Sequence, residues 1–111
     1  MNKVKAILEA AKKDFGIHDD FKIRRKKMKI KAASISFKTR VIRINKELEC
    51  NPEFINYLIY HELAHYKLRT KLHNHEFYEL LNSRLGEKKV NNLEKSILRK
   101  MLEINHIRSF D

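Results

Sequence analysis

The stretch that most constrains the fold begins at Asn51-Pro52, because these residues suit the N-cap and the first position of a helix. The pattern predicts a helix from Pro52 to about Leu68. Its apolar residues cover most of the circumference: Phe54, Ile55, Leu58, Ile59, Leu63, Ala64 and Leu68. A helix that is apolar on nearly every side must be buried, so we expect this one at the centre of the core.

The segments around this helix predict an α+β fold. A helix is expected over residues 3–15, with Gly16 as its C-cap. Alternating patterns predict strands at about 21–25, 28–37 and 40–45, with a turn at Lys38-Thr39. Two further helices are expected at about 75–85 and 89–107. The prediction is one domain over residues 1–111, with an N-terminal helix, a small, mainly antiparallel sheet, the buried helix and two C-terminal helices.

Length and composition exclude several classes of protein. A chain of 111 residues suits one domain with one core. No apolar run approaches the roughly 20 residues of a membrane helix, and the N-terminus lacks the pattern of a secretory signal, so we expect a cytoplasmic protein without a membrane partner. Cys50 is the single cysteine and has no partner for an internal disulfide. Any metal must therefore be held by His, Asp or Glu.

The positive charge is concentrated in the first half of the chain. Residues 1–46 hold fifteen Lys or Arg against four Asp or Glu, whereas residues 47–111 hold ten of each. The excess centres on Lys22–Lys31, a basic strip that could attract phosphate backbones or an acidic partner. A solvated strand face that protects a sheet edge from aggregation is the alternative. Association with nucleic acid is therefore a candidate, although no recognised nucleic-acid motif accompanies the strip.

The buried helix carries His61-Glu62-Leu63-Ala64-His65. Two histidines four residues apart lie on one face of a helix and can bind one zinc ion. Glu62 is rotated by about 100° from His61, where its carboxylate can reach a water on the ion and act as a general base. The alternative is a pair of core-edge histidines bound to the backbone, with Glu62 facing solvent.

A catalytic zinc ion needs a third protein ligand. The residue six positions after His65 is Lys71, which cannot serve. His75 opens the next predicted helix after a short loop, and antiparallel packing of the two helices would bring it back toward the pair. We therefore predict His75 as the third ligand, with His73 and Glu79 as the alternatives.

The motifs from Met28 to Tyr78 resemble the YgjP-like metallopeptidase domain family and, more distantly, the SprT-like zincins. The resemblance is carried by Ile42-Arg43-Ile44-Asn45, by Pro52, by Ile55-Asn56-Tyr57-Leu58-Ile59-Tyr60 before the HELAH motif, and by Asn74-His75-Glu76-Phe77-Tyr78. It implies a zincin-like fold, zinc at His61, His65 and His75, and Glu62 as general base. Where the family usually has Trp-Gly-Ser-Cys, this chain has Ala32-Ala33-Ser34-Ile35.

These observations predict a zinc-dependent metallopeptidase that binds one Zn2+ and hydrolyses a peptide or protein substrate. By analogy with other zincins, the strand around Ala32 to Phe37 is expected to pair with the extended substrate. Two alternatives are a catalytically silent, zinc-stabilised module associated with nucleic acid and a zinc hydrolase that acts on a non-peptide substrate.

Overall fold

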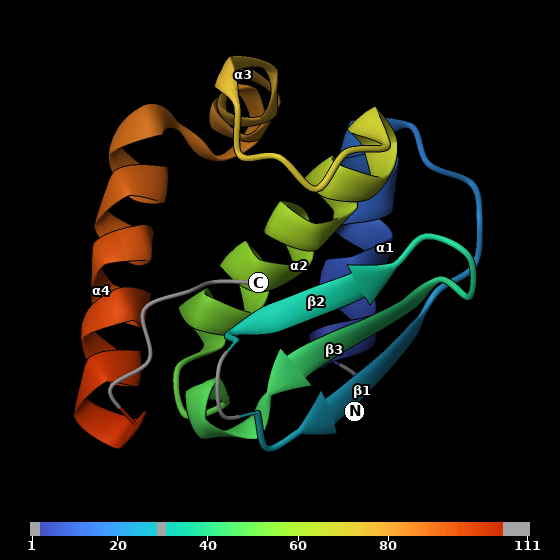
Figure 1. Cartoon of the computed structure of the whole chain (residues 1–111). Coiled ribbons are helices and arrows are strands. Elements are labelled where there is room, and N and C mark those ends of the chain that lie inside the picture. Colours follow the sequence, from blue (N-terminus) through green and yellow to red (C-terminus); the bar gives the residue numbers. More distant parts are fainter. Residues whose placement is uncertain (1–2, 29–30, 106–111) are drawn as a thin grey trace.

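The central element is the helix α2 (Pro52–Leu68), which crosses behind the sheet in Figure 1. The computed structural model describes residues 3–28 and 31–105. Asn51 caps α2 by accepting a hydrogen bond from the Glu53 amide at 2.9 Å, and Arg69 ends it in a left-handed conformation. Every residue from Tyr57 to Tyr66 is buried. The predicted position of this helix in the core is confirmed.

Three strands form a small sheet over α2. They are β1 (Lys22–Lys26), β2 (Ala33–Ser36) and β3 (Val41–Asn45), in the order β1-β3-β2. The inner face is apolar, since Ile35, Ile42 and Ile44 are buried, and it packs on α2. The sheet is mixed, because β2 pairs with β3 antiparallel while β1 pairs with β3 parallel. The expected sheet was mainly antiparallel, so the parallel pair was not foreseen.

Asn45 provides a physical reason for this topology. Its buried side-chain amide donates to the backbone carbonyls of Met28 and Lys31, each at 3.0 Å. The backbone N–H of Asn45 donates to the carbonyl of Ala32 at 2.8 Å. The connection from β1 to β2 is thereby held across the end of β3, which separates the two strands. All three of these carbonyls lie within the strand expected at 28–37, but only Ala33–Ser36 of that range forms a strand, so it is shorter than predicted. Lys29 and Ile30 lie outside the described residues.

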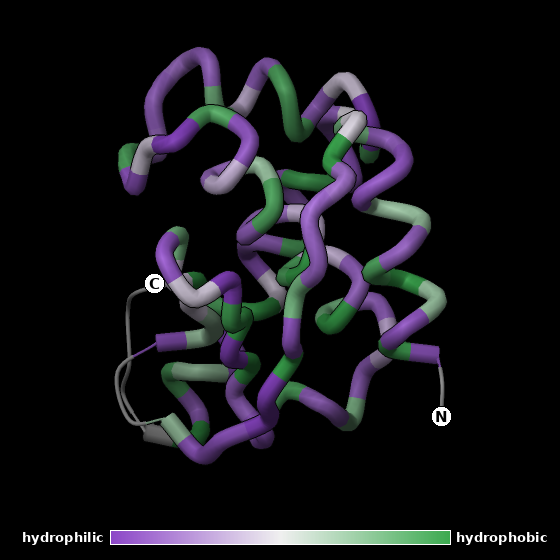
Figure 2. Tube along the Cα trace, turned by 90° about the vertical axis from the view of Figure 1, so that its right-hand side faces the viewer, coloured by the Kyte–Doolittle hydropathy of each residue, from purple (hydrophilic) through white to green (hydrophobic). Residues whose placement is uncertain are grey.

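Three other helices surround α2, as Figure 1 shows. They are α1 (Lys3–Phe15), α3 (His75–Leu85) and α4 (Glu87–Asn105), and the short 3-10 helix η1 (Lys46–Leu48) follows β3. The alternation of hydrophobic and hydrophilic colour along the tube in Figure 2 matches the amphipathic pattern of these helices. In the described part of the chain, four helices and a small sheet form one compact domain, which agrees with the predicted fold class. Within residues 3–28 and 31–105, no helix has the length and apolar character needed to span a membrane.

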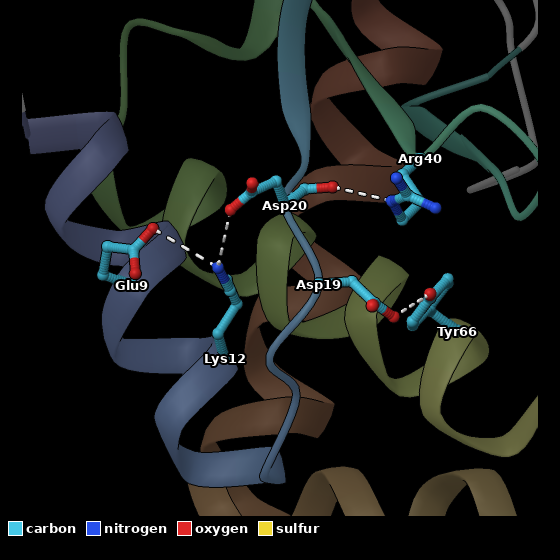
Figure 3. A network of polar contacts seen from close by, with 6 residues as sticks. All are labelled: Glu9, Lys12, Asp19, Asp20, Arg40 and Tyr66. Carbon is cyan, nitrogen blue, oxygen red and sulfur yellow. Dashed lines mark hydrogen bonds and ion pairs between the residues drawn. The ribbon is translucent and has the colours of Figure 1, made fainter.

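The segment between α1 and β1 is fastened by polar contacts, shown in Figure 3. Lys12 lies between Glu9 at 3.7 Å and Asp20 at 3.9 Å, and Arg40 donates to the Asp20 carbonyl at 3.0 Å. The Tyr66 hydroxyl donates to Asp19 and lowers the pKa of that carboxyl. Tyr66 therefore ties α2 to the segment between α1 and β1.

Candidate metal centre

Three imidazoles converge where the end of α2 meets the loop 69–74. His61 Nε2 lies 3.1 Å from His73 Nε2, and His65 Nε2 lies 3.2 Å from the same atom. His61 and His65 are both 0% exposed, whereas His73 is exposed. The cluster is thus built from a buried helical pair and one histidine delivered by the loop.

The partners of His61 determine where its proton lies. Its Nδ1 is 3.1 Å from the Tyr57 hydroxyl, which is itself 2.5 Å from Glu94 Oε2. A carboxylate only accepts, so the single hydroxyl proton goes to Glu94 and the Tyr57 oxygen accepts from His61 Nδ1–H. Neutral His61 therefore presents the lone pair of Nε2 to the centre of the cluster.

His65 is oriented in the same way by the backbone. Its Nδ1 lies 2.8 Å from the carbonyl oxygen of Thr70, which can only accept. The Thr70 amide donates back to the His65 carbonyl at 3.1 Å. This reciprocal pair fixes the start of the loop 69–74 against α2 and leaves the Nε2 lone pair of His65 directed at the cluster.

The cluster fits a zinc ion. Two Nε2 lone pairs face His73, which can offer a proton to only one of them, so a shared cation satisfies all three nitrogens better than hydrogen bonds do. Tetrahedral zinc with Zn–N distances of about 2.0–2.1 Å places ligand nitrogens about 3.3 Å apart. The separations of 3.1 and 3.2 Å are close to this value.

Phe77 of α3 forms the apolar wall of the cluster. Its ring is 0% exposed and stacks on His65, with centroids 4.4 Å apart and planes inclined by 25°. The same ring meets His61 edge-on at 4.8 Å and His73 at 5.2 Å. One aromatic side chain therefore limits the movement of all three imidazoles.

Glu62 is 0% exposed and adjoins the first histidine of the pair. The alternative in which Glu62 faces solvent does not hold. Glu62 is therefore enclosed at the position that follows His61 on α2, and buried titratable groups of this kind are candidates for a role in catalysis.

The structure does not bring His75 to the pair. Its side chain is 89% exposed at the start of α3, where Nε2 lies 3.7 Å from Glu79, itself exposed. Asn74 is the N-cap of α3, with its side chain accepting from the Phe77 amide at 3.0 Å. His73 therefore lies just outside the helix and can turn to the cluster, whereas His75 points to solvent. The expected placement of His75 was wrong, and His73, the alternative, lies there.

The sequence held a signal for this arrangement. The buried face of α3 contains Phe77 and Leu81, and His75 is about 200° around the axis from Phe77. A residue on the face opposite to the core cannot reach a buried pair on α2. The same reasoning would have placed the ligand before Asn74.

Two further residues of the site were missed. Tyr57 lies one turn before His61 and on the same face of α2, a spacing that brings side chains together. Glu94 interrupts the apolar stripe of α4 that contains Val90, Ile97 and Met101. A carboxylate within an apolar stripe indicates a buried polar partner, here two tyrosine hydroxyls.

The basic strip 22–31 lies apart from this centre, as far as its described residues show. Its strand β1 is an edge of the sheet, and Arg25 pairs with Glu49 at 3.0 Å. Lys29 and Ile30 are outside the described residues. Basic side chains on an edge strand also suit the protective role considered above.

Comparison with known proteins defines the class. The sequence matches the YgjP-like metallopeptidase domain family over residues 1–97. It is 32% identical over 101 residues to an uncharacterised protein of Methanocaldococcus jannaschii, covering 89% of this chain and 92% of the relative. An uncharacterised protein of Aquifex aeolicus is 42% identical over 67 residues, which are 59% of this chain and 61% of that protein.

Two solved structures share the fold. The metallopeptidase zymogen abylysin of Pyrococcus abyssi superposes with a TM-score of 0.80 at 30% identity, over 94% of this chain and 99% of that one. The metallopeptidase zymogen jannalysin of Methanocaldococcus jannaschii gives 0.78 at 31% identity, over 89% and 90%. The chain belongs to the YgjP-like metallopeptidase domain family, which makes it a metal-binding hydrolase of the peptidase class. None of these similarities supports the candidate association of the basic strip with nucleic acid.

Proposed function

We propose that this protein is a zinc-dependent peptidase in which His61, His65 and His73 hold one Zn2+ and Glu62 is the general base. The observation that carries the proposal is the convergence of three Nε2 atoms, two of them with their Nδ1 protons engaged elsewhere. A bound zinc ion would supply a Lewis acid that polarises a scissile carbonyl and acidifies a water.

The protein's own groups supply the remaining chemistry. Glu62 takes a proton from the attacking water on its carboxylate and passes it to the leaving amine. Its burial keeps bulk water away from that carboxylate and strengthens its electrostatic interactions. Phe77 and the two Nδ1 hydrogen bonds hold the imidazoles so that little reorganisation is needed.

The substrate is proposed to pair with the free edge of β2. This strand is the edge of the sheet that contacts α2, and it pairs with β3 on its other side. Lys71, in the loop that also carries His73, donates from Nζ to the carbonyl of Ile35 and lies 4.6 Å from the Phe37 ring centroid. The Ile35 carbonyl is therefore able to accept a hydrogen bond from outside the sheet, as strand addition requires.

The proposed mechanism is tested with Glu62→Gln, which keeps the shape of the side chain but removes the base. We expect the variant to retain zinc and to cleave unstructured proteins about 10²–10⁴-fold more slowly than the wild type. New termini in an unstructured protein such as casein are counted by mass spectrometry, with zinc content measured on the same samples. Equal cleavage by both proteins, or none by the zinc-loaded wild type, would contradict the proposal.

Substrate pairing with β2 is tested with Lys71→Met, which keeps an unbranched side chain but removes the donor. We expect KM to fall while kcat is unchanged, because the Ile35 carbonyl no longer has to exchange one donor for another. Lys67→Met on the exposed end of α2 is the control. A KM unchanged or raised by Lys71→Met, relative to this control, would argue against pairing at Ile35.

A further inference from the structure

Glu94 connects the last helix to the metal centre. Its Oε2 accepts from Tyr57 of α2 at 2.5 Å and from Tyr78 of α3 at 2.9 Å. Glu94 is half-buried, and it stands on the stripe of α4 that faces the core. One carboxylate oxygen thus joins three helices at a point one hydroxyl away from His61.

The two helical histidines depend on different partners for their orientation. His65 relies on the carbonyl of Thr70, five residues away in the chain, so local backbone geometry is sufficient. His61 relies on a side chain, Tyr57, whose hydroxyl can either donate to Nδ1 or accept from it. The tautomer of His61 is therefore decided by what else that hydroxyl contacts.

The proton count makes Glu94 the deciding group. With Glu94 as acceptor, Tyr57 donates to the carboxylate and accepts from His61 Nδ1–H, so Nε2 carries the lone pair. Without Glu94, the hydroxyl can donate to Nδ1 instead, which moves the imidazole proton to Nε2. In that tautomer His61 directs a proton, rather than a lone pair, at the position between the three histidines.

We propose that Glu94 is a positioning residue for the metal centre, acting through Tyr57 to hold His61 in its metal-binding tautomer, with Tyr78 anchoring the carboxylate. This inference rests on the proposed zinc site and adds to it a dependence on α4. Hydrogen-bond partners that orient a metal-binding histidine typically contribute about 10–100-fold to metal affinity, and we expect an effect of this size from Glu94.

The experiment compares zinc affinities, measured by competition with a chromophoric chelator, for the wild type, Tyr57→Phe, Glu94→Ala and the double variant. Each single substitution should weaken zinc binding about 10–100-fold. The double variant should be no weaker than about the worse single variant, because both remove the same relay. Cobalt-loaded Tyr57→Phe and Glu94→Ala should also show altered visible absorption bands, since these bands report ligand geometry.

Tyr60→Phe is the matched control. Tyr60 lies on α2 next to His61 and donates to Asp14 of another helix at 2.6 Å, so it forms the same type of pair outside the centre. It should lose thermal stability without losing zinc affinity. Zinc affinity of Glu94→Ala and Tyr57→Phe equal to that of Tyr60→Phe would overturn the inference, as would simple additivity in the double variant. Failure of the wild type itself to bind zinc would instead refute the proposed function.

Discussion

The two sides of the candidate metal centre are built differently. On α2, His61 and His65 are fully buried and one turn apart, and the Nδ1 atom of each makes a hydrogen bond that orients the ring. On the loop 69–74, His73 is exposed and is positioned by its neighbours, the Thr70 turn on one side and the Asn74 cap on the other. The helical half of the site is fixed by the core, whereas the loop half depends on a few local contacts.

This difference also explains what the sequence could and could not predict. Helical periodicity fixes which residues share a face, so the buried α2 and the pairing of His61 with His65 were predictable. A loop has no such period, so the sequence could argue against His75 from the apolar face of α3 but could not show that the loop turns His73 toward the pair. The parallel pairing of β1 with β3 was equally hidden, because it depends on the distant contacts of Asn45.

The strongest test of the comparison removes one candidate ligand at a time. We expect His65→Ala to lose zinc most completely. His73→Ala should also weaken zinc binding, and by a larger factor than the roughly 10–100-fold that is typical when a residue only orients a ligand. His75→Ala should bind zinc like the wild type, because its imidazole is exposed and faces away. Chelator competition measures all three. Loss of zinc from His75→Ala with retention in His73→Ala would reverse the assignment.

The wall shared by both halves is tested with Phe77→Ala. Removing a fully buried ring should lower the free energy of unfolding by about 3–5 kcal/mol, measured by urea denaturation of metal-free protein. Zinc affinity should fall as well, since the ring contacts all three imidazoles. Phe54→Ala, two turns before His61, is the control for buried aromatic loss. Equal zinc affinities in the two variants would show that Phe77 only fills the core.

The local support of the loop half is tested by comparing two helix caps. Asn74→Ala and Asn51→Ala each remove a side-chain acceptor at a helix N-terminus, and each should cost about 1 kcal/mol of stability. Only Asn74→Ala should also weaken zinc binding, because Asn74 fixes the chain next to His73. Stability is followed by urea denaturation and zinc binding by competition. A similar loss of zinc affinity in Asn51→Ala would show that the effect is global.

The smallest effect concerns Tyr60 of α2, which is directed at Asp14 of α1 rather than at the histidine cluster. Burial, together with donation to Asp14, raises the pKa of Tyr60 from 10.0 to about 12. Between these values the unfolded chain has released the Tyr60 proton while the folded protein keeps it, so the free energy of unfolding falls as pH rises. Tyr60→Phe lacks this contribution, and the stability difference between wild type and variant should shrink from pH 9 to pH 11 in urea titrations. A constant difference would contradict the linkage.

The most direct test of the centre is a crystal structure of the zinc-loaded protein, with the ion located by anomalous scattering at the zinc edge. We expect one zinc ion within about 2.0–2.1 Å of Nε2 of His61, His65 and His73, with His75 remote from it. Zinc bound by His75 or Glu79, or no zinc at the His61–His65 pair, would contradict the proposed site.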